Sequence, residues 1–145
     1  MITASAKKRE NIAEYLIYMW QIEDIIRAYQ LDIDKIQQGI IDKYENLDEE
    51  KRKEMREWYE SLIDMMRREG VEKSGHLQLN KNVLIDLNNL HNRLLKNPKF
   101  APYAAEFYKT LPYIVEIREI AGENKKDELE SCFDALYGIL MLRLS

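Results

Sequence analysis

The chain has 145 residues, of which 46% are hydrophobic and 33% are charged, with only 5 glycines and 3 prolines. This length fits one domain, residues 1–145, and the composition favours packed helices over a β-sandwich or a disordered chain. The net charge of −4 argues against a general nucleic-acid binder, and the single cysteine, Cys132, excludes an internal disulfide. Because that thiol lies between apolar neighbours, it is typical of a core residue in a reducing compartment, and we expect a cytoplasmic protein.

The N-terminal region has basic residues ahead of an apolar stretch, which is one feature of a signal peptide. Glu14 interrupts that stretch, and its longest unbroken apolar run, residues 15–20, is too short to cross a membrane. We therefore expect neither export nor a membrane span.

Residues 12–29 are the most apolar part of the chain. On a helical wheel the polar residues Glu14, Gln21 and Asp24 gather at one narrow edge, and apolar side chains fill most of the remaining arc. A helix this apolar must be covered on several sides. The expected fold is therefore all-α, an antiparallel bundle of five to six helices around this central N-terminal helix.

Glu23 lies inside the apolar arc of the central helix. An unpaired ion there costs several kcal/mol, roughly the stability of a small domain, so Glu23 needs a partner or a proton. Arg27, one turn further along, and His91 and Arg143 from later helices are the candidate partners. We interpret the site first as a buried ion pair that sets helix register; a carboxylic acid or metal ligand at a pocket wall is the functional alternative.

Helical spacing and capping residues predict five further helices. Asp32 and Asp48 are N-cap candidates, Asn80 or Asn82 can cap the fourth helix, and Gly70 can adopt the left-handed conformation that ends the third. The predicted helices span residues 32–44, 48–70, 80–96, 103–120 and 126–144.

Two rows of apolar residues at helical spacing should face the core. They are Met55, Tyr59, Leu62 and Met66 on the third helix, and Val83, Leu87, Leu90 and Leu94 on the fourth. Pro112 lies in the middle of the fifth helix, where it cannot bond to the carbonyl of Tyr108, and we expect a kink or a short break there. Residues 70–80 should form an ordered loop that places His76 at the mouth of a pocket.

Three segments of the chain, NIAEYLIYMWQIEDIIRA, REWYESLIDMMRREGVEKSGHLQLNKNV and YKTLPYIVEIRE followed by CFDALYGILMLRL, carry a resemblance that spans nearly its whole length. Together they resemble an uncharacterised bacterial family of small helical proteins, a domain of unknown function. The resemblance implies a helical fold and brings no catalytic residue, reaction or ligand.

Catalytic motifs are missing from the sequence. It has no zinc-protease, phosphate-loop, dinucleotide or paired-cysteine motif, and neither His76 nor His91 follows a Glu at the spacing of a di-iron site. A nucleophilic cysteine site would require Cys132 to leave its expected core position. We therefore expect no catalytic residue, no metal ligand and no cofactor.

One enzyme class stays open as an alternative, a magnesium-dependent helical phosphohydrolase acting on nucleotides. Acidic residues on the third helix could share a hard cation, with help from Glu23 or Asp24. The same acids also have basic neighbours at helical spacing, which is typical of a solvated face. The acids on the third helix are Glu54, Glu57, Glu60 and Asp64.

Aromatic and methionine content favours a different class, a helical interaction module that forms a homo-oligomer or acts as an adaptor for another protein. Nine tyrosines, two tryptophans and six methionines exceed what the expected core rows use. Aromatic residues at a surface commonly mark contacts, although ordinary boundary packing also explains them. The candidate interface residues are Tyr18, Trp58, Tyr108 and Tyr113.

A last alternative is a weak binder of nucleic acid or an anionic surface. Its basic clusters are residues 7–9 and 51–53, and the second follows three acidic residues that largely cancel its field. We expect no nucleic-acid partner.

Overall fold

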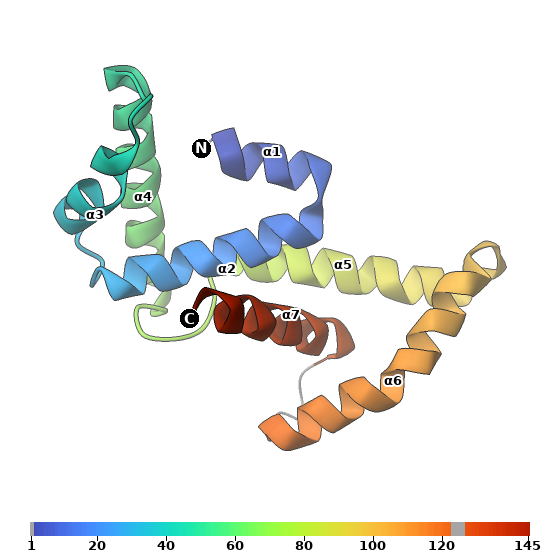
Figure 1. Ribbon diagram of the computed structural model, residues 1–145. Coiled ribbons are helices and arrows are strands. Elements are labelled where there is room, and N and C mark those ends of the chain that lie inside the picture. Colours follow the sequence, from blue (N-terminus) through green and yellow to red (C-terminus); the bar gives the residue numbers. More distant parts are fainter. Residues whose placement is uncertain (1, 123–126) are drawn as a thin grey trace. The chain divides into compact units, whose positions relative to one another are not determined.

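The computed structural model describes residues 2–122 and 127–145, and every regular element within these ranges is a helix. The all-α prediction is therefore confirmed, with one more helix than expected (Figure 1). The α-helices are α1 (Ile2–Glu10), α2 (Ile12–Ala28), α3 (Ile33–Gly39), α4 (Glu49–Glu69), α5 (Gln78–Lys96), α6 (Ala101–Ala121) and α7 (Glu128–Leu144). Short 3-10 turns, η1 (Ile41–Lys43) and η2 (Pro98–Phe100), follow α3 and α5.

The helices form two compact units, Met1–Lys81 and Asn82–Ser145, which we call the first and the second unit. Helix α5 begins in the first unit and continues into the second. Each unit is described by itself.

The first unit opens with α1, the helix that the sequence did not predict. Figure 1 shows α1 and α2 running antiparallel beside each other. Asn11 separates the two helices and caps α2, since its side-chain oxygen accepts a hydrogen bond from the amide of Glu14 at 3.2 Å. Lys7 of α1 also pairs with Glu14 at 2.7 Å. Within residues 3–10 of α1, Ala4 is the one buried hydrophobic residue, so the sequence of these positions shows no apolar periodicity that would predict a helix.

The core of the first unit is built mainly from α2 and α4, as expected. Helix α2 ends at Ala28, close to the predicted boundary, and α4 buries the whole predicted row. Asp48 caps α4 through a 2.8 Å bond from the amide of Lys51, and Gly70 ends it at φ 70°, so both predicted signals are confirmed. The buried residues are Tyr15, Leu16, Met19, Trp20, Ile22, Glu23 and Ile26 on α2, and Met55, Tyr59, Leu62, Ile63 and Met66 on α4.

Helix α3 is shorter than predicted. It begins after Asp32, the expected cap, but ends at Gly39 instead of Tyr44, and the 3-10 turn η1 follows. Arg52 of α4 holds this turn, because its guanidinium donates to the carbonyl oxygens of Ile41, Leu47 and Tyr44. The connection is therefore shaped by a contact from α4 and not by its own helical pattern.

In the second unit, α6 continues through Pro112 from Ala101 to Ala121. The predicted break is absent, and Figure 1 shows the axis of α6 bending along its length, in accord with the predicted kink. Gly122 ends the helix at φ 69°, in the left-handed conformation that glycine adopts readily.

The apolar row predicted on α5 is largely wrong. Val83 is buried, whereas Leu87 and Leu94 are half-buried and Leu90 is exposed. The buried hydrophobic residues described in the second unit are Val83, Ile114 and Phe133. The second unit thus hides little of its apolar surface. Across both units, no helix in the described ranges is long and apolar enough to cross a membrane.

Candidate functional site

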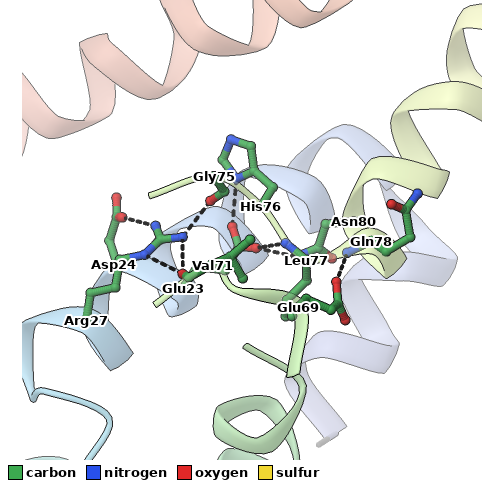
Figure 2. A network of polar contacts seen from close by, with 10 residues as sticks. All are labelled: Glu23, Asp24, Arg27, Glu69, Val71, Gly75, His76, Leu77, Gln78 and Asn80. Carbon is green, nitrogen blue, oxygen red and sulfur yellow. Dashed lines mark hydrogen bonds and ion pairs between the residues drawn. The ribbon is translucent and has the colours of Figure 1, made fainter. Parts of the chain in front are cut away.

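The candidate site is built around Glu23, whose carboxylate is buried on α2 with only 1% of the residue exposed. Its Oε1 atom lies 2.8 Å from Nδ1 of His76. Its Oε2 atom accepts hydrogen bonds from the backbone amide of Leu77 at 2.7 Å and from Nδ2 of Asn80 at 3.2 Å (Figure 2). Both carboxylate oxygens are therefore satisfied by residues far along the chain, which is how the helix tolerates a buried acid.

The carboxylate of Glu23 also caps α5. Leu77 directly precedes the first helical residue, Gln78, whose amide donates to Glu69 Oε1 at 2.7 Å. Two acidic side chains thus satisfy amides at a helix N-terminus, where the macrodipole favours negative charge. The prediction that Asn80 or Asn82 caps this helix is wrong, because both lie inside α5.

Contacts with Trp20 and Glu23 hold the ring of His76 in place. Its ring stacks on Trp20 with centroids 4.2 Å apart and planes at 12°, while Nδ1 faces Glu23. The side chain remains 29% exposed. An imidazole held by a carboxylate on one nitrogen keeps its second nitrogen in a fixed direction, the arrangement that orients histidine bases and histidine metal ligands.

Arg27 fixes the loop that carries His76. Its guanidinium donates to the carbonyl oxygen of Val71 at 3.1 and 3.3 Å and to that of Gly75 at 2.5 Å, and it pairs with Asp24 at 2.9 Å. The predicted pairing of Arg27 with Glu23 is therefore wrong. The loop is ordered, as expected, and it buries Val71 and Leu77.

His91 lies in the second unit in a separate cluster. The residue is 3% exposed, its Nδ1 lies 2.5 Å from the hydroxyl of Tyr103, and its ring packs edge-on against Phe107 at 4.5 Å. Burial lowers the pKa of His91, and the nearby carboxylate of Glu128 opposes that shift. His91 was a predicted partner of Glu23; its Nδ1 hydrogen bond is with Tyr103 instead.

Two further residues considered in the sequence analysis, Cys132 and Arg143, lie on α7 of the second unit. Cys132 is half-buried, and burial together with Glu128 raises the pKa of its thiol. A protonated thiol is a weak nucleophile, so the geometry gives no support to a catalytic cysteine. Arg143, the third predicted partner of Glu23, is exposed near the end of α7.

The four candidate interface residues fall into two pairs. Tyr18 and Trp58 are half-buried in the first unit, where burial raises the pKa of Tyr18 to about 12 and Trp58 lines a cavity of about 570 Å³. Tyr108 and Tyr113 are exposed on α6 in the second unit. The two pairs thus differ in setting, because only Tyr108 and Tyr113 of these four residues are exposed.

The alternative sites use exposed side chains of α4. The four acids proposed for magnesium are all exposed, and Glu60 is bound to Arg56 at 3.0 Å. Within residues 2–122 and 127–145 no group of three or more His, Cys, Asp or Glu is placed to hold a metal ion. In the basic clusters, Lys7 pairs with Glu14, and Arg52 is engaged by backbone carbonyls. The magnesium and anionic-surface hypotheses therefore remain predictions.

Sequence reasoning named Glu23, Arg27 and His76, and the structure brings these three to one place through α2 and the loop before α5. It missed Trp20 and Asn80 as partners of the site. The sequence indicated Trp20 only as an apolar position on a helix. Such a pattern does not predict that the ring of His76 stacks on it. Asn80 is buried and donates its amide to Glu23, although its sequence context favoured a helix cap.

The whole chain, residues 1–145, matches the family described as a domain of unknown function (DUF4924), and the chain belongs to that family. Comparison with curated proteins found no match, and comparison with solved structures found none. The expected resemblance to a domain of unknown function is thus confirmed over the full length.

Proposed function

We propose that this chain is a helical interaction module that pairs with a second copy of itself through the apolar surface of its second unit. The supporting observation is where large hydrophobic side chains are exposed. In the described part of the first unit Tyr44 is the one such residue. Those of the second unit are Ile85, Leu90, Phe100, Tyr103, Tyr108, Tyr113, Val115, Ile117, Ile120, Leu136, Ile139, Leu142 and Leu144.

The second half of α7 is the clearest apolar part of this exposed surface. Residues 135–142 contain no charged side chain. Leu136, Ile139 and Leu142 recur every three positions and are 50%, 54% and 76% exposed. A helix that is apolar around its circumference is normally buried, and a large exposed apolar patch commonly marks an interface.

Helix α6 extends the same kind of surface. Tyr108 and Tyr113 are exposed there, together with Ile117 and Ile120. Tyrosine suits an interface because its ring buries apolar area while its hydroxyl finds a polar partner. The exposed residues of α6 include both hydrophobic and aromatic types, which is typical of the centre of a contact.

A second copy is the occupant that we propose. Most soluble oligomers are symmetric homo-oligomers, and in a two-fold dimer one patch covers its own equivalent. An uncharged stripe such as that of α7 meets this condition, because pairing it with itself brings no like charges together. A monomeric chain would instead favour an adaptor role, in which a different protein covers the same stripe of α7.

The test is sedimentation of the full chain at several concentrations. We expect a dimer for the native sequence and a monomer for Ile139→Glu, which places a charge in the stripe. Tyr44→Glu is the matched control, since it makes the same change at an exposed hydrophobic residue of the first unit and should leave the dimer intact. Circular dichroism of each variant confirms that it is folded. A native chain that stays monomeric at the highest concentration contradicts self-pairing.

A further inference from the structure

We propose that Nε2 of His76 is an acceptor for a phosphoryl group. This inference concerns the first unit and does not rest on the proposed dimer. It begins with the direction of the ring: Figure 2 shows Nδ1 of His76 facing Glu23 and the other ring nitrogen pointing away from the drawn side chains. Within the first unit no described residue hydrogen-bonds Nε2, and the side chain is 29% exposed.

The carboxylate of Glu23 sets which nitrogen carries the proton. Oε2 of Glu23 accepts two hydrogen bonds, and a carboxylate can only accept, so the proposal assigns the ring proton to Nδ1, facing Oε1, and the lone pair to Nε2. The contacts of Oε2 with Leu77 and Asn80 hold the carboxylate in place behind the ring. Glu23 is therefore a positioning residue, which orients the imidazole and stabilises positive charge that develops on it.

The ring is also held rigidly before any reaction. Trp20 covers one face at 4.2 Å, and Arg27 fixes the carbonyl of Gly75, the residue directly before His76. A nucleophile with a fixed direction loses less freedom when it reacts.

The transfer step forms one bond and breaks one bond. The lone pair of Nε2 attacks phosphorus and forms the N–P bond, while the bond from phosphorus to the donor's leaving group breaks and that group departs with the electron pair. The imidazole keeps its Nδ1 proton, hydrogen-bonded to Glu23. With phosphoramidate as donor the leaving group is ammonia, and with acetyl phosphate it is acetate.

The chain supplies a matched control residue. His91 is the second of its two histidines, is 3% exposed and has its Nδ1 on the hydroxyl of Tyr103. Burial also lowers the pKa of His91, so the ring is neutral at pH 7, as a nucleophile must be. Accessibility and orientation therefore distinguish His76 from His91.

The experiment treats the full chain with phosphoramidate at pH 7 and follows intact mass, with ³¹P NMR to identify an acid-labile phosphoryl-histidine. We expect one phosphoryl group, located on His76 by peptide mapping. It should be lost in His76→Gln and kept in His91→Gln. The rate should exceed that of free N-acetylhistidine by at least about tenfold, the factor that about 1.4 kcal/mol of transition-state stabilisation supplies.

Two further measurements make the proposal decidable. Glu23→Gln, if folded by circular dichroism, should slow phosphorylation of His76, and ¹⁵N shifts of the ring should show the proton moved from Nδ1 to Nε2. Acetyl phosphate should transfer its phosphoryl group; an acetyl adduct at His76 would instead identify an acyl acceptor. Labelling of His91, no labelling, or a rate equal to that of N-acetylhistidine overturns the proposal. Sedimentation is a separate readout, so failure of either proposal leaves the other standing.

Discussion

Glu23 and Leu77 are separated by 54 positions in sequence, yet Oε2 of Glu23 lies 2.7 Å from the backbone nitrogen of Leu77 at the start of α5. A carboxylate in the middle of one helix thus acts as the cap of another. The contact explains why an acid is retained on the most apolar face of α2. It also ties the beginning of α5 to α2 without a cap in the local sequence.

Replacing Glu23 with glutamine should destabilise the first unit. The change removes the charge at the start of α5 and weakens the bonds to His76 and Leu77, for an expected loss of about 1–3 kcal/mol in unfolding free energy. Urea denaturation followed by tryptophan fluorescence measures it. Asp24→Asn is the control at the next position, where the exposed pair with Arg27 should cost less than about 1 kcal/mol. Equal losses in the two variants would show that the cap contributes little.

Replacing Arg27 with lysine should loosen the loop before α5. Lysine keeps the charge but cannot bond the carbonyls of Val71 and Gly75 from one planar group. We expect faster hydrogen exchange at residues 71–77 and a loss of about 1.5–3 kcal/mol, the range for hydrogen bonds to charged groups. Arg67→Lys serves as the control, since that exposed arginine makes a single bond to the carbonyl of Leu31. Unchanged exchange in Arg27→Lys would contradict the role of Arg27.

The buried ring of His91 should make the protein less stable in acid. Burial lowers its folded pKa below the ordinary value of 6.5, so the unfolded chain binds the proton more tightly. The stabilising contribution is complete above pH 6.5 and is lost as pH falls from there through the folded pKa. Unfolding free energies of the native chain and His91→Gln at pH 7.5 and 5 test this. Carboxylates titrate in both, so the native chain should lose more; equal losses would exclude His91.

Replacing Gly39 and Gly138 with alanine should change the stability of the protein in opposite directions. A Cβ atom at Gly39 would lie 2.6 Å from both Cε1 and the hydroxyl oxygen of Tyr29, which must move, and we expect a loss of about 1 kcal/mol. At Gly138 in α7 nothing lies within 4 Å, and alanine should stabilise the helix by about 0.5–1 kcal/mol. Thermal melts of the two variants measure the difference. Similar shifts in melting temperature for both variants would show that the side chain of Tyr29 moves aside at little energetic cost.

Local signals predicted the elements whose causes are local. Helix α4 has its cap Asp48, its left-handed Gly70 and its buried row within one segment, and all three were readable. Helix α1 has one buried hydrophobic residue among positions 3–10 and lies against α2, so apolar periodicity could not predict it. Helix α5 begins where Glu23 and Glu69 reach its amides, a start that the sequence near Asn80 does not encode.

The candidate site was predictable only in part, for the same reason. The position of Glu23 in an apolar arc indicated that it needed a partner. That inference could be drawn from the sequence of a single helix, residues 12–29. The partners proved to be the imidazole of His76 and the backbone amide of Leu77, from the loop after α4 where no periodicity applies, and the side-chain amide of Asn80 in the first turn of α5. Arg27 was at the right spacing to pair with Glu23, but the loop carbonyls offered its guanidinium more acceptors.

The two units carry different natural reporters of their own unfolding. Both tryptophans, Trp20 and Trp58, belong to the first unit, while the one cysteine, Cys132, belongs to the second. Because Cys132 is half-buried with a raised thiol pKa, a pulse of thiol reagent should label it mainly when the second unit opens. Fluorescence and labelling on the same denaturant series would then coincide if residues 1–145 unfold as one cooperative domain, and separate if each unit melts independently.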